Sequence, residues 1–180
     1  MNQESNQSVN LPRPGRDVMV VGVGLHPFGR FPNQDLASLA SDSVVSALQD
    51  AGVRWQDVPV AYFGHVYYHG MSVGETALSK LGLTGIPIIN VENACSSGST
   101  AFWQAYWSVS TGMFDLALAF GAEKVPSGPV TVTSEESPER YIGADHMMGG
   151  YALRMRRYME ETGAPATSFA QVAVKARQNG

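Results

Sequence analysis

The sequence lacks several features that whole classes of proteins require. It contains a single cysteine, so no intramolecular disulfide can form, and this favours a reducing compartment. No uninterrupted apolar run approaches the roughly 20 residues of a membrane-spanning helix. The polar residues 1–16 contain no apolar segment typical of a signal peptide. We therefore expect a cytoplasmic protein that does not bind membranes, in which residues 1–16 form a flexible tail.

Basic residues are also scarce. The chain has 12 Lys and Arg against 16 Asp and Glu, a formal net charge of −4, and no block of basic residues stands out. A protein that binds nucleic acid through its surface normally carries a basic patch. We therefore expect no nucleic-acid partner, although a local basic pocket for a small anion is compatible with this composition.

After the tail, strand and helix patterns alternate along the chain. Runs of branched apolar residues predict strands, and apolar residues at helical spacing predict helices. Asn33 or Asp35 can cap the first helix, and Gly52 follows its end. We expect strands at 17–24, 60–68, 86–91 and 115–122, and helices up to 51, at 74–82 and at 97–111. This alternation is typical of an α/β fold with a mostly parallel sheet covered by helices.

The regular alternation ends near Glu123. Prolines and glutamates interrupt 123–149, and so long an irregular segment is uncommon unless it is functional. Two more helices are expected near 150–162 and 168–178. We therefore divide the chain into 17–122, which holds the sheet, and 123–180, a loop domain with closing helices.

The helix expected at 97–111 is apolar or aromatic around nearly its whole circumference. A helix of this kind is buried on all sides, whereas the outer helices of a single three-layer domain are amphipathic. We therefore expect this helix to need cover from a further sheet or a further chain.

The only cysteine, Cys95, lies between a predicted strand and this apolar helix. The free N–H groups and the positive dipole at a helix start favour a thiolate. The same N–H groups can hold the negative oxygen of a tetrahedral intermediate, worth about 2.7–4 kcal/mol per donor. Free cysteines are also often buried and inert, so position alone leaves both interpretations open.

The residues around Cys95 favour chemistry. The stretch "NVENACSSGSTA" resembles the nucleophile motif of the thiolase superfamily, with Asn93 before the cysteine and Gly98 closing a Cys-x-Ser-Gly core. "VMVVGVGLHPFGR" resembles the first strand and turn of that family, and "GMFDLALAFGAEKV" its strand ending in Gly-x-Glu. The resemblance extends over 17–178 and is nearest to the branch of sterol-carrier and lipid-transfer thiolases.

This resemblance implies a fold and a reaction. Thiolases stack two similar halves as five αβαβα layers, with the nucleophile helix buried between two sheets. Their cysteine attacks a 3-oxoacyl-CoA, a carbon–carbon bond breaks, and CoA removes the acyl group from the sulfur. CoA is therefore a substrate and no prosthetic group is expected. The resemblance also implies a homodimer, and a small OB-fold partner protein with a zinc ribbon.

The sequence departs from the family in its length. Thiolases are about twice as long, and their second half carries an activating histidine in a Gly-His-Pro motif and often a second cysteine. Neither is present in this chain. We therefore expect the nucleophile half only, with the C-terminal half absent and catalysis incomplete without a second half or a partner chain.

Three residues of "HMMGG" resemble the loop-domain His-Met-Gly of the family. This likeness implies that His146 contacts CoA and that Met147 or Met148 lines the acyl pocket, against the alternative of ordinary core packing. Asn93 and Gly98 are expected to shape the turn at the nucleophile rather than to react.

Two further groups of residues are assigned a structural role. Arg156 and Arg157 are spaced to pair with Glu160 and Glu161 on an exposed helix face, although contact of a nearby arginine with the CoA nucleotide stays open. His65 and His69 lack a third ligand at a usable spacing. We therefore expect no metal site.

The sequence therefore predicts an acyltransferase that carries out 3-oxoacyl-CoA thiolysis through an acyl-Cys95 intermediate, in lipid or aromatic catabolism. Two alternatives stay open. One is a retro-aldolase that cuts steroid side chains from a hydroxyacyl-CoA. The other is a lipid-binding or scaffolding subunit that does not catalyse.

Overall fold

The computed structural model describes residues 15–68, 70–125, 127–128, 130 and 138–179. The chain forms two compact units, 1–125 and 126–180, which are described separately below. The sequence-based division fell three residues earlier, between 122 and 123. Most of the predicted tail lies outside the described residues, and so does the part of the predicted irregular segment over 131–137.

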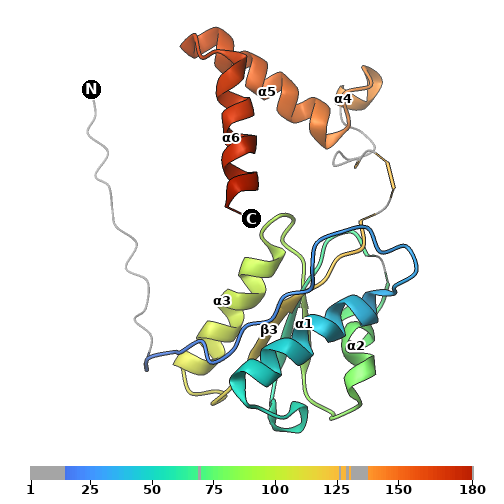
Figure 1. The fold of residues 1–180 in the computed structure, drawn as a ribbon, viewed down its shortest axis with the longest axis vertical. Helices are drawn as coiled ribbons and strands as arrows, with labels where there is room; N and C mark the ends of the chain where they lie inside the picture. Colours follow the sequence, from blue (N-terminus) through green and yellow to red (C-terminus); the bar gives the residue numbers. More distant parts are fainter. Residues whose placement is uncertain (1–14, 69, 126, 129, 131–137, 180) are drawn as a thin grey trace. The chain divides into compact units, whose positions relative to one another are not determined.

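The first unit is built on a three-stranded parallel sheet in the order β2-β1-β3. Its strands are β1 (Ala61–Gly64), β2 (Ile88–Val91) and β3 (Leu118–Gly121), shown in Figure 1. Three of the predicted strands are confirmed, each shorter than its apolar run. The register aligns Phe63 of the central strand with Asn90 on one side and Phe120 on the other.

Helices cover both faces of this sheet. On one face lie α1 (Leu36–Ala51) and α2 (Val73–Leu78), followed by a 3-10 turn at Ser79–Leu81; a second 3-10 turn is at Trp55–Asp57. The other face is covered by α3 (Ser97–Ser110). The side chains of β1 alternate between the two faces as a strand requires. Phe63 packs with Leu36 and Ala77, while Tyr62 packs with Ala101 and Ala105.

Local signals at its ends explain why α1 spans these residues. The carboxylate of Asp35 accepts the N–H of Ser38 at 2.7 Å, which satisfies one of the free donors of the first turn. Gly52 ends the helix in the left-handed conformation at φ 66°. The predicted helix and its cap at Asp35 are confirmed.

The strand predicted at 17–24 is wrong. The segment is extended but pairs with no strand, and its branched side chains are exposed. Both edges of β1 are occupied by β2 and β3, and the segment lies against α1 instead. A Cβ at Gly24 would be 2.1 Å from the carbonyl oxygen of Ser43, and the N–H of Val23 donates to Asp50 at 2.9 Å. Contact with a helix therefore replaces the expected sheet pairing.

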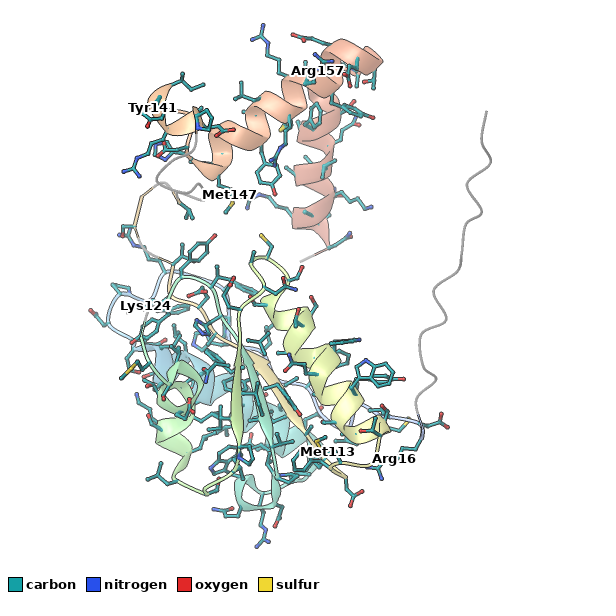
Figure 2. The ribbon with its side chains drawn as sticks, turned by 180° about the vertical axis from the view of Figure 1, so that it is seen from behind. Arg16, Met113, Lys124, Tyr141, Met147 and Arg157 are labelled. Carbon is teal, nitrogen blue, oxygen red and sulfur yellow. The ribbon has the colours of Figure 1, made fainter. Side chains whose placement is uncertain are left out.

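The beginning of this segment is attached to the far end of α3. The guanidinium of Arg16 bonds to Asp115 at 2.8 Å and to the carbonyl oxygens of Val109 and Phe114. Its backbone N–H donates to the carbonyl of Ser110 at 3.1 Å. Figure 2 shows the Arg16 side chain beside the last turn of α3. Arg16 therefore closes the C-terminal end of this helix.

The apolar helix α3 is buried on one side only within this chain. Ala101 and Ala105 pack on the sheet, whereas Phe102 and Trp103 are 56% and 58% exposed. The expected burial on all sides is therefore not met by the residues that the structure describes. Large aromatic side chains at this exposure leave an apolar surface uncovered.

The second unit is helical. It contains α4 (Pro138–Tyr141), α5 (Met147–Thr162) and α6 (Ala166–Gln178). The two predicted closing helices are confirmed, and Gly163 separates them at φ 71°. The expected ion pairs are present, with Arg156–Glu160 at 3.7 Å and Arg157–Glu161 at 2.6 Å. None of the helices that the structure describes is both long enough and apolar enough to cross a membrane.

Candidate active site

The candidate site lies where the strands of the parallel sheet end. In a parallel sheet all carboxyl ends meet at the same edge, and ligands bind beyond that edge. Cys95 follows the end of β2 and precedes the first residue of α3, with Ser96 at the N-cap position. Its side chain is exposed. Cys95 is therefore not a buried filler but a thiol accessible at the functional edge of the sheet.

The turn that presents Cys95 is strained. Ala94, which precedes the cysteine, has a φ of 45°, in the left-handed region that a residue with a Cβ enters at a cost of about 1–2 kcal/mol. Strain of this kind persists only where neighbouring contacts impose it, and it concentrates at functional sites. The sequence showed only a small residue here, with no sign of strain.

Hydrogen bonds from Ser97 impose this conformation. Its hydroxyl donates to the carbonyl of Ala94 and accepts the N–H of Asn93, both at 2.8 Å, and its own N–H donates to the same carbonyl at 3.1 Å. The serine is buried. The second serine of the motif therefore fixes the turn from beneath the cysteine.

Asn93 and Gly98 flank the cysteine in different ways. The Asn93 amide donates to the hydroxyl of Thr100 at 3.0 Å, linking the turn to the helix. A Cβ placed on Gly98 would meet no heavy atom within 4 Å. The space over Gly98 is therefore open at the start of the helix, where an acyl group has to approach the sulfur.

The end of β1 supports the first turn of α3 from below. A Cβ on Gly64 would lie 2.7 Å from the carbonyl carbon and oxygen of Ser97 and 2.8 Å from the nitrogen of Gly98. Real Cβ contacts essentially never fall below 3.0 Å. Glycine at 64 therefore allows the strand and the nucleophile helix to approach this closely.

A residue that the sequence analysis assigned no role connects the third strand to this region. Glu123, just beyond β3, accepts the N–H groups of Val66, Tyr67 and Tyr68. The sequence signal was the Gly-x-Glu that ends the strand at 115–122. Spacing alone did not indicate which groups the carboxylate binds, because its donors lie 55–57 residues away in the chain.

On the other face of the sheet, a polar group links α2 to β2. The Asn90 amide accepts the N–H of Gly74 at 2.6 Å and donates to Glu75 at 3.1 Å. A Cβ on Gly74 would be 3.0 Å from the same amide oxygen. These contacts hold the start of α2 against the strand that leads to Cys95.

The structure adds no metal site. His65 follows β1 and stacks on Phe63 with ring centroids 5.2 Å apart, and its Nδ1 is buried without a hydrogen-bond partner among the described residues. His69 lies outside those residues. Within the described ranges no three His, Cys, Asp or Glu side chains come together as metal ligands do.

The predicted CoA and acyl-pocket residues lie in the second unit. His146 is the N-cap of α5, with its Nδ1 3.9 Å from Asp145. Met147, labelled in Figure 2, begins the helix and its N–H donates to the carbonyl of Val130 at 2.9 Å. Met148 is exposed. Their relation to Cys95 stays a prediction, because each unit is described by itself.

Comparison with known proteins identifies the family. Residues 18–180 match the family described as "Thiolase, N-terminal domain". The chain is 38% identical over 170 residues to benzoylsuccinyl-CoA thiolase subunit BbsB of Thauera aromatica, covering 91% of this chain and 43% of that protein. It is 40% identical over 176 residues to sterol carrier protein 2 of Gallus gallus, covering 89% of this chain and 32% of that protein.

A solved structure supports the same fold. The structure titled "Ltp2-ChsH2(DUF35) aldolase" superposes with a TM-score of 0.62 and 25% identity, covering 86% of this chain and 41% of that chain. This chain thus spans less than half the length of these relatives. With its α/β fold and the family match over 18–180, the chain belongs to the thiolase superfamily, as an N-terminal domain of its sterol-carrier and lipid-transfer branch.

Proposed function

We propose that this chain supplies the nucleophile of an acyl-CoA C-acyltransferase, a 3-oxoacyl-CoA thiolase. The observation that carries the proposal is the placement of Cys95, exposed on a strained turn at the start of α3, at the carboxyl edge of a thiolase-family sheet. A thiol at a helix start is activated by the dipole and the free N–H groups.

The reaction proceeds in two acyl transfers. A base removes the thiol proton, and the Cys95 sulfur adds to C3 of a 3-oxoacyl-CoA, whose carbonyl oxygen becomes an oxyanion. The C2–C3 bond breaks, its electron pair stays on C2, and C2 takes up the proton. The thiol of a second CoA, deprotonated in turn, attacks the acyl carbon, and Cys95 leaves as thiolate.

The general base lies outside this chain in our proposal. Among the described residues no side chain is hydrogen-bonded to the Cys95 sulfur, and the relatives are more than twice as long as the matched region. We place the base on that further half, whether it continues this chain or belongs to a partner. The exposed Phe102 and Trp103 of α3 support cover by such a half.

The relatives also suggest a substrate class and partners. The name benzoylsuccinyl-CoA thiolase supports an acyl group bulkier than acetoacetyl, and the word "subunit" supports more than one kind of chain. We propose acyl-CoA and CoA as substrates without a prosthetic group, a homodimer, and an OB-fold and zinc-ribbon partner like the second protein in the aldolase complex. The single cysteine supports a cytoplasmic location.

A retro-aldolase is the second candidate, because the superposed structure is titled an aldolase. Cys95→Ala separates the two reactions. We expect thiolysis to fall at least about a thousandfold in this variant, because the nucleophile is removed. Because the side chain is exposed, the melting temperature should stay the same. Turnover retained in Cys95→Ala would point to the aldolase.

The first experiment is intact mass spectrometry of the natively purified protein with everything that copurifies, before and after incubation with a 3-oxoacyl-CoA. An acyl adduct mapped to Cys95 supports the thiolase. Cys95 that stays free of adduct and unreactive toward thiol reagents, with every partner present, refutes it and favours a lipid-binding subunit, in keeping with relatives named sterol carrier protein.

A further inference from the structure

Three consecutive backbone N–H groups donate to a single carboxylate at the edge of the sheet where Cys95 lies. The N–H groups of Val66 and Tyr67 reach one oxygen of Glu123 at 2.6 and 2.9 Å, and that of Tyr68 reaches the other at 3.0 Å. Such successive donors form an anion-binding concavity. Hydrogen bonds to an ionised acceptor are roughly twice as strong as neutral ones. Glu123 therefore holds the loop after β1, residues 65–68.

The carboxylate is itself well anchored. It belongs to a half-buried residue immediately after β3, and it also accepts the N–H of Lys124 at 3.1 Å. The ammonium group of Lys124, labelled in Figure 2, bonds to the carbonyl oxygen of Gln34, before α1. The loop after β1 is thus attached to a rigid strand end rather than to a mobile surface side chain.

The loop held by Glu123 in turn supports the nucleophile. On its N-terminal side, Gly64 is in the tightest contact with Ser97 and Gly98 that the backbone permits. The N–H of His65 donates to the carbonyl of Val91 at 3.2 Å, at the point where β2 ends and the chain turns toward Cys95. A displacement of the loop would therefore move both segments that flank the cysteine.

We propose that Glu123 is a positioning residue for Cys95, acting through the loop 65–68 rather than by contact with substrate. This inference rests on the proposed acyl-transfer function for its main assay. Glutamine at 123 keeps the size of the side chain but offers one acceptor oxygen and an NH₂ group, which cannot accept the N–H of Tyr68. Alanine leaves all three N–H groups without this partner.

The test uses the natively purified protein in four forms: wild type, Glu123→Gln, Glu123→Ala and the control Asp115→Asn. Asp115 precedes β3 at the opposite edge of the sheet, and its carboxylate is exposed and bonded to Arg16. The acylation rate of Cys95 is measured by intact mass against acyl-CoA concentration. Alkylation of Cys95 by iodoacetamide and the melting temperature are measured in parallel.

We expect Glu123→Gln to lower the maximal acylation rate about tenfold and Glu123→Ala about a hundredfold, since a misplacement of 1 Å can cost that much. The acyl-CoA concentration for half-maximal rate should change less than about twofold, because Glu123 does not touch substrate. Asp115→Asn should acylate like wild type. A wild-type maximal rate in folded Glu123→Gln, with only the melting temperature lowered, would overturn the proposal and leave Glu123 a purely structural residue.

Failure of the proposed function is distinguishable from failure of this inference. If wild type forms no acyl adduct, the thiolase reading fails, and alkylation then decides the role of Glu123. We expect Glu123→Gln to be alkylated at least about threefold more slowly than wild type, because Cys95 moves away from the N–H groups that favour its thiolate. Equal alkylation rates in the two proteins would refute positioning.

Discussion

Replacing Gly64 with alanine places a methyl group in the contact between β1 and the first turn of α3. The new Cβ would lie 2.7 Å from the backbone carbonyl of Ser97, whereas real contacts stay above 3.0 Å. The obstacle is backbone, with no flexible side chain to rotate away. The strand and the helix must therefore separate, by about 0.3 Å to reach the closest tolerated distance and more to reach ordinary contact.

The expected cost follows from this overlap. Overpacking a tight contact destabilises by about 1–3 kcal/mol, and each kcal/mol lowers the melting temperature of a domain of this size by roughly 2–8 °C. We expect Gly64→Ala to melt several degrees lower, as measured by circular dichroism. Because the helix start moves, acylation of Cys95 in the folded fraction should also fall.

Gly98→Ala is the matched control, one turn residue away in the same motif. A Cβ at Gly98 meets no atom within 4 Å, and alanine is favoured over glycine in a helix by up to about 1 kcal/mol. Its melting temperature should therefore equal or exceed that of wild type. If Gly64→Ala melts like wild type, or if both variants are equally destabilised, the reasoning from the close contact is refuted.

Two further predictions concern the turn at the nucleophile and the cap of α1. Ala94→Gly removes the strain at φ 45° and should raise the free energy of unfolding by up to about 1 kcal/mol; a loss of stability in urea unfolding would contradict this. Hydrogen bonds from the Ser38 hydroxyl and N–H, and from Lys80, lower the pKa of Asp35 to about 2. This stabilisation is therefore present above the ordinary pKa of 3.8 and is lost as the pH falls toward 2. The melting temperature of Asp35→Asn should accordingly depend less on pH than that of wild type between pH 4 and 2, and parallel curves would exclude the cap as the cause.

Much of the chain's organisation followed from local signals. The helix α1 could be placed because Asp35 and Gly52 act on backbone groups within a few residues of themselves. The start of α3 and the position of Cys95 before it followed from the motif and its apolar continuation. The ion pairs of α5 followed from helical spacing alone. Each of these features depends on neighbours in sequence.

The strand predicted at 17–24 failed for the opposite reason. A branched apolar run is suited to an extended conformation, and nothing within it distinguishes pairing with a strand from lying on a helix. The choice was made by residues far along the chain, since Gly22 and Gly24 approach α1 closely and Asp50 accepts the N–H of Val23.

The sequence by itself thus determined the α/β class, the family and the residue proposed to react, because caps, periodicity and the cysteine motif are local patterns. Only the tertiary structure decided how that residue is held. Gly64 and Glu123 act on groups 33 and more than 50 residues away, through contacts that exist only once the three strand ends meet at one edge. A parallel sheet brings together segments that are distant in sequence, so the support of Cys95 is a property of the fold rather than of any one stretch.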